Sequence, residues 1–80
     1  MATMDLASHK LYWLTNMMLA GALARKYGLH EAGAIKRCAR RLRDSTRSAD
    51  LHELAQLVLK ARDESIVNVI NGLFEEKTNV

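Results

Sequence analysis

The sequence predicts an all-α protein, and its composition is the first reason. Proline is absent, only four glycines occur, and 49% of the 80 residues are hydrophobic. Alanine and leucine outnumber the β-branched and aromatic residues that strands favour, and few residues could form hairpin turns. Three stretches show apolar side chains at helical spacing. We therefore expect one domain over residues 1–80, built as a helical hairpin followed by a long C-terminal helix.

The first helix is expected over about residues 5–27. Asp5 can cap its start, and Arg25 and Lys26 followed by Gly28 form a suitable end. Its apolar residues lie on two nearly opposite sides, and a helix that is apolar on two sides must be covered on both. An 80-residue chain has little material for this, so a homodimer is expected. One stripe is Leu11, Leu14, Met18 and Ala22, and the expected dimer or partner seam is Trp13, Met17, Ala20 and Ala24.

The second helix is expected over about residues 30–44, after Gly28 and with Glu31 in its first turn. Its apolar side holds Cys38, which we interpret as a small core residue, since a thiol on an apolar stripe is usually inert. Its other side is basic. The predicted binding face for an acidic partner or nucleic acid is Lys36, Arg37, Arg40, Arg41 and Arg43.

The third helix is expected over about residues 50–76, opened by a capping box of Asp50 and Glu53. A break near Arg62 is the alternative, and it would give four helices; we favour one long helix. Its expected core stripe is Leu51, Leu54, Ala55, Val58, Ala61, Ser65, Val69 and Leu73.

Several classes of protein are disfavoured. A single cysteine allows no internal disulfide, which fits a cytoplasmic location. The apolar run over residues 11–24 is short of the roughly 20 residues that span a bilayer. The three histidines lack metal-ligand spacing, and no phosphate loop or nucleophile–base pair is visible. We expect no enzyme, cofactor, metal, small-molecule substrate or membrane partner.

The charges are segregated along the chain. Residues 25–47 carry eight cations and two carboxylates, whereas residues 48–80 carry six carboxylates and three cations. The acidic end of one molecule could meet the basic middle of another. With the two-sided first helix, this favours a protein-interaction module, acting as an adaptor, chaperone or regulator.

A nucleic-acid-binding regulator is the alternative. Residues 23–37, LARKYGLHEAGAIKR, resemble the helix-turn-helix DNA-binding pattern, with Gly28 at the turn. The resemblance implies that Lys36, Arg37 and Arg40 contact DNA. Ala34 and Arg37 stand where the pattern has bulky apolar residues.

Overall fold

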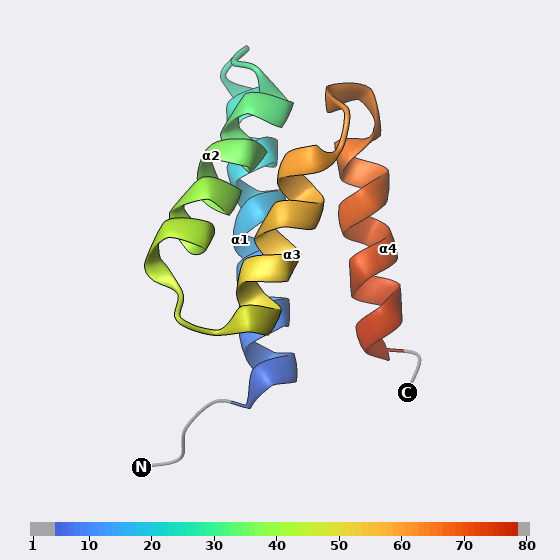
Figure 1. Cartoon of the computed structure of the whole chain (residues 1–80). Coiled ribbons are helices and arrows are strands. Elements are labelled where there is room, and N and C mark those ends of the chain that lie inside the picture. The colour runs from blue at the N-terminus through green and yellow to red at the C-terminus, as the bar shows by residue number, and fades with distance from the viewer. Residues whose placement is uncertain (1–4, 79–80) are drawn as a thin grey trace.

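The protein is an all-α bundle, as the sequence predicts. The computed structural model describes residues 5–78, and within them the helices are α1 (Leu6–Lys26), α2 (Glu31–Ser45), α3 (Ala49–Lys60) and α4 (Ile66–Thr78). The helices lie side by side (Figure 1), with α2 packed along α1, α3 against α2, and α4 mainly against α1. No helix in this range is both long enough and apolar enough to cross a membrane.

The ends of α1 are set by local signals, and both were predicted. At the start, the Asp5 carboxylate accepts a hydrogen bond from the Ser8 backbone N–H at 2.8 Å. This bond lowers the pKa of Asp5. At the other end Gly28 has a φ of 72°, which glycine adopts without strain. The Leu29 N–H then donates to the Ala24 carbonyl at 2.7 Å, closing a Schellman cap.

The predicted cap of the third helix is wrong by two residues. α3 begins at Ala49, and Ser48 is its N-cap: the Ser48 hydroxyl accepts a hydrogen bond from the Leu51 N–H at 3.3 Å. The capping box of Asp50 and Glu53 is therefore not formed, although Asp50 still places a carboxylate in the first turn, where it complements the helix dipole.

The predicted long helix over 50–76 is also wrong, because α3 ends at Lys60 and a separate helix follows. Ala61 and Arg62 are extended, with ψ of 145° and 149°, and a short 3₁₀ turn, η1 (Asp63–Ser65), follows. A helix over 50–76 would be about 40 Å long, against about 31 Å for α1, so at least about 9 Å of it would extend beyond α1. The break lets α4 fold back and bury its apolar face.

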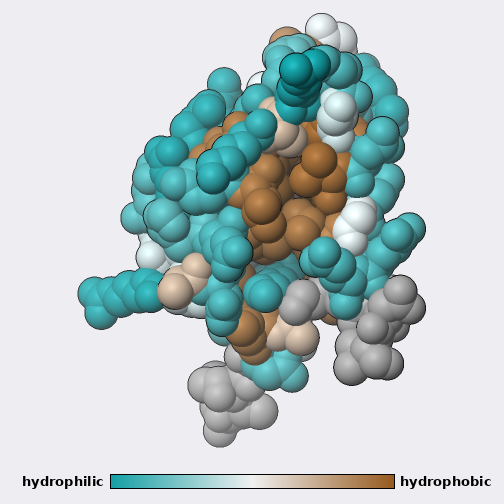
Figure 2. Space-filling model, turned by 45° about the vertical axis from the view of Figure 1, so that its right-hand side comes forward, coloured by the Kyte–Doolittle hydropathy of each residue, from teal (hydrophilic) through white to brown (hydrophobic). Residues whose placement is uncertain are grey.

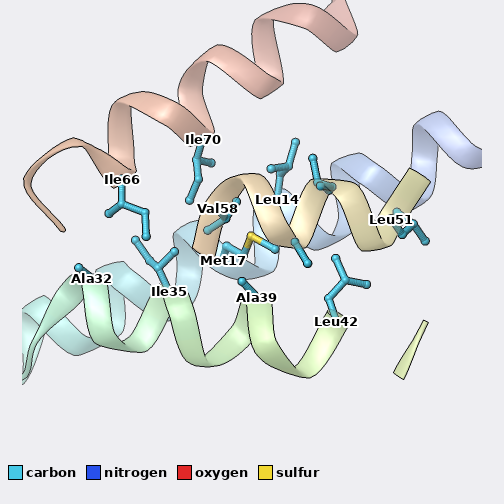
Figure 3. Packing of buried hydrophobic residues seen from close by; sticks show 12 residues of the cluster. Leu14, Met17, Ala32, Ile35, Ala39, Leu42, Leu51, Val58, Ile66 and Ile70 are labelled. Carbon is cyan, nitrogen blue, oxygen red and sulfur yellow. The ribbon is translucent and has the colours of Figure 1, made fainter. Parts of the chain in front are cut away.

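One hydrophobic core is shared by all four helices. Buried side chains from each helix converge at its centre (Figure 3), where Leu14, Val58 and Ile70 are fully buried. In the predicted third-helix stripe, the part before the break is correct. After the break the fully buried residues are Ile66 and Ile70, whereas the expected Ser65 and Val69 are only partly buried; Leu73 packs against the core as expected.

Candidate interaction groove between α1 and α2

One side of α1 is left uncovered by the bundle. Its buried residues form a single stripe, and the side beyond that stripe exposes Leu19 and Leu23, each with 56% of its surface accessible. Tyr12 is exposed on the same side. Their spacing of seven and four residues places all three on one face of α1. The helix therefore does carry apolar residues on a second side, but these residues belong to neither of the two predicted stripes.

These residues form one wall of a groove that runs between α1 and α2. The groove holds about 500 Å³, and its floor includes Trp13, Ala20 and Ala34. The indole of Trp13 meets the ring of Tyr12 edge to face, with centroids 5.8 Å apart. We call this surface the arginine groove. Its lining residues are Tyr12, Trp13, Asn16, Leu19, Ala20, Leu23, Ala34, Arg37, Cys38 and Arg41.

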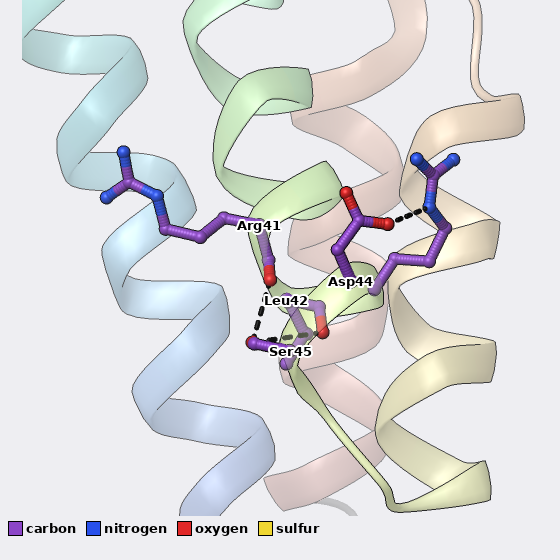
Figure 4. Close-up of polar contacts among 5 residues, drawn as sticks. Arg41, Leu42, Asp44 and Ser45 are labelled. Atoms are coloured by element: carbon purple, nitrogen blue, oxygen red, sulfur yellow. Dashed lines mark hydrogen bonds and ion pairs between the residues drawn. The ribbon is translucent and has the colours of Figure 1, made fainter.

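The opposite wall of the arginine groove is basic. Arg37 and Arg41 lie four residues apart on α2, so their side chains share one face of the helix. Figure 4 shows the Arg41 side chain extending toward α1, away from Asp44. Both arginines are exposed, and neither forms an ion pair with any described residue. No carboxylate lines the groove, so its charge is uncompensated.

The other predicted basic residues do not share this wall, which corrects the single basic face expected from the sequence. Lys36 points to the far side of α2, where its ammonium lies 3.0 Å from the Asp63 carboxylate and ties α2 to η1. Arg43 pairs with its neighbour Asp44 at 3.0 Å. Arg40 is exposed at the end of the groove, in a second hollow that shares Arg37 with the first.

The four residues of the predicted seam are split by the structure. Met17 and Ala24 belong to the core stripe of α1 and are buried within the single chain, so they cannot contact a partner. Trp13 and Ala20 line the arginine groove. Of the expected seam, only Trp13 and Ala20 are placed where a partner could reach them.

Cys38 packs against the core, as predicted, but it is not fully enclosed there and also lines the groove. It is half-buried on α2. Burial raises the pKa of its thiol, and the positive charge of Arg41 partly offsets that effect. The thiol is therefore protonated at neutral pH and is a weak nucleophile.

We expect native Cys38 to react with a thiol reagent more slowly than in denaturant at neutral pH, because less thiolate is present and access is partial. The difference between the native and denatured reaction rates should become smaller as the pH rises through the raised pKa of the Cys38 thiol. Rates of alkylation measured against pH, with and without denaturant, test this. Equal rates at every pH would contradict the half-buried position.

Three exposed apolar residues of the groove were not identified from the sequence: Tyr12, Leu19 and Leu23. They lie between the two stripes assigned to the first helix. Their spacing of seven and four residues places them on one face of the helix and could have identified them. This face could not be distinguished from the others in the sequence, because nearly every residue from 11 to 24 is apolar.

No group of three histidine, cysteine or acidic side chains that could hold a metal occurs in the part of the chain described. Comparison with known protein families, curated proteins and solved structures found no match for this chain.

Proposed function

We propose that this protein is a non-enzymatic interaction module whose arginine groove binds an apolar helix face edged by carboxylates. The observation that carries the proposal is the pairing of two walls: exposed Leu19 and Leu23 on α1, and the unpaired Arg37 and Arg41 on α2. A partner helix with leucine-sized side chains and carboxylates at helical spacing could pack against the leucines of α1 and form ion pairs with the arginines of α2.

The dimensions of the groove fit a helix. Its lining residues on α1 extend over 12–23, which corresponds to about 16 Å or three helical turns. Covering the leucines would stabilise a complex by roughly 1–2 kcal/mol each, because each is about half exposed at the start. The arginines would add orientation and a faster association rate more than affinity.

The packing of α1 and α2 supports helix docking over the helix-turn-helix alternative. The two helices of that motif cross at about 90–120°, which frees the second helix to enter a DNA groove. Here α2 runs back along α1 (Figure 1), and the arginine groove is lined by both helices from Tyr12 to Leu23. Arg37 and Arg41 therefore line the same groove as the exposed side chains of α1.

A pair of designed peptides tests the proposed function. Both are amphipathic helices with leucines at i, i+3, i+4 and i+7; one carries glutamates beside them and the other carries lysines. Trp13 is the only tryptophan and lies in the groove, so its emission reports binding. We expect the glutamate peptide to shift the emission and the lysine peptide to leave it unchanged.

The double substitution Arg37→Glu with Arg41→Glu should reverse this preference. Both side chains are exposed, so the free energy of unfolding should change by less than about 1 kcal/mol. The control is Arg47→Glu with Arg62→Glu, which changes the net charge equally at exposed positions outside the groove and should keep the original preference.

Two results would contradict the proposal. One is a groove variant that keeps the wild-type peptide preference. The other is binding of unrelated DNA duplexes at about 0.15 M salt that is lost in the groove variant, since this would favour the nucleic-acid alternative.

A further inference from the structure

A second apolar surface is left open on the other side of the bundle, between α3 and α4. Figure 2, turned so that the α4 side comes forward, shows hydrophobic residues gathered in a hollow ringed by hydrophilic ones. Leu57 on α3 is 46% exposed, and it lines a cavity of about 150 Å³ to which α1, α3 and α4 all contribute side chains. We call this cavity and its rim the acidic hollow. Its lining residues are Lys10, Asp50, Glu53, Leu54, Leu57, Leu73 and Glu76.

The acidic hollow is the electrostatic opposite of the arginine groove. Its rim carries three carboxylates and one ammonium, whereas the groove carries two guanidinium groups and no carboxylate. Asp50, Glu53 and Glu76 are exposed, and none of them forms an ion pair with any residue that the structure describes. Each surface therefore presents apolar side chains beside charges that lack partners.

The spacing of the two surfaces also matches. Asp50, Glu53 and Leu57 lie at i, i+3 and i+7 on one face of α3. Arg37 and Arg41 lie at i and i+4 on one face of α2. In both cases the charged groups are about one helical turn apart, so two carboxylates can face two guanidinium groups at once.

Symmetric pairing of either surface with itself is disfavoured. Two arginine grooves face to face would bring four guanidinium groups together without a carboxylate, and two acidic hollows would gather six carboxylates around two ammonium groups. Only the unlike pairing compensates the charges. The two surfaces share no residue, and although α1 contributes Lys10 to the hollow and one wall to the groove, the other residues of the hollow come from α3 and α4, so one chain can use both surfaces at the same time.

We propose that the arginine groove of one molecule binds the α3 face at the rim of a second copy's acidic hollow, where Asp50 and Glu53 lie beside Leu57, so that Leu57 of one chain packs against Leu19 and Leu23 of the next. This inference rests on the proposed function, since it names an occupant of the same groove. Such a head-to-tail contact is heterologous, so it repeats from copy to copy and builds open chains or a ring.

Sedimentation of the full chain tests the proposal with two variants. The groove variant is Leu19→Gln with Arg37→Gln, and the hollow variant is Glu53→Gln with Leu57→Gln. All four side chains are exposed, and glutamine is a good helix former, so both variants should keep the wild-type helical content by circular dichroism.

The wild-type mass should rise with concentration from 9.0 kDa to species beyond a dimer, and it should fall again at high salt. Each variant alone should associate at least about tenfold more weakly. An equimolar mixture should form a dimer and nothing larger. In this dimer the intact groove of the hollow variant binds the intact hollow of the groove variant. The two surfaces that remain free are the substituted ones, so no further copy can bind.

Three results would overturn the head-to-tail contact: a wild-type protein that stays at 9.0 kDa up to millimolar concentration, a mixture that stays monomeric, or a hollow variant that associates like the wild type. The last would indicate groove-to-groove pairing. If the wild type stays monomeric but the glutamate peptide still shifts Trp13 emission, the proposed function stands and only self-association fails.

Discussion

Replacing Met17 by alanine should lower the free energy of unfolding by about 2–5 kcal/mol, the usual cost of truncating a large buried side chain. Met17 has no exposed surface and contacts the shared core, so the substitution leaves a cavity that close-packed neighbours cannot fill. A single core in a chain this small supplies only a few kcal/mol. We therefore expect a large part of the protein to be unfolded at ambient temperature.

Leu19→Ala is the matched control, because Leu19 is two residues further along α1 and is exposed. Its substitution should change the free energy of unfolding by less than about 0.5 kcal/mol, yet it should weaken binding of the glutamate peptide about tenfold. Urea unfolding followed by circular dichroism gives the first quantity, and Trp13 emission gives the second. Equal stability losses in the two variants would contradict the assignment of Met17 to the core and Leu19 to the groove.

Replacing Gly21 by alanine should destabilise the protein by up to about 2 kcal/mol, although alanine is the better helix former by about 1 kcal/mol. Gly21 is buried where α1 meets α2, and an added Cβ would lie 2.9 Å from two side-chain carbons of Ile35. Ile35 is itself fully buried, so it cannot move aside without disturbing the core. Overpacking of this kind costs about 1–3 kcal/mol, which outweighs the gain in helix propensity.

Gly72→Ala should change the free energy of unfolding in the opposite direction. Gly72 is exposed on α4, and an added Cβ would meet no atom within 4 Å. The greater helix propensity of alanine is then the only effect, so this substitution should stabilise the protein by about 0.5–1 kcal/mol. Chemical unfolding of both variants measures the difference. Stabilisation by both would show that α1 and α2 are not in close contact at Gly21.

The sequence predicted part of the lining of the arginine groove, namely Trp13, Ala20, Arg37 and Arg41, but not its exposed apolar residues. A first helix that is apolar on two sides indicates an uncovered surface, and the basic run indicates an anionic partner. Which apolar residues stay exposed depends on where α2 and α4 pack against α1. Burial of Met17 and exposure of Leu19 are therefore properties of the assembled bundle.

The sequence alone determined the features that depend on neighbours within about one helical turn. Asp5 caps α1 through the N–H of Ser8, Gly28 takes the positive φ that ends α1, and α2 begins within a residue of its expected start. These follow from hydrogen bonds and backbone conformation that close locally, so no other part of the chain can change them easily.

The tertiary structure decided whatever depends on partners far along the chain. The length of α1 limits how much of a continuous third helix could be buried, so the break after Lys60 and the phase of α4 are set by packing. In the same way, Lys36 pairs with Asp63 across the bundle while Arg41 stays unpaired beside α1. Helical spacing shows which side of α2 is basic, but only the folded chain determines which of those charges are left for a partner.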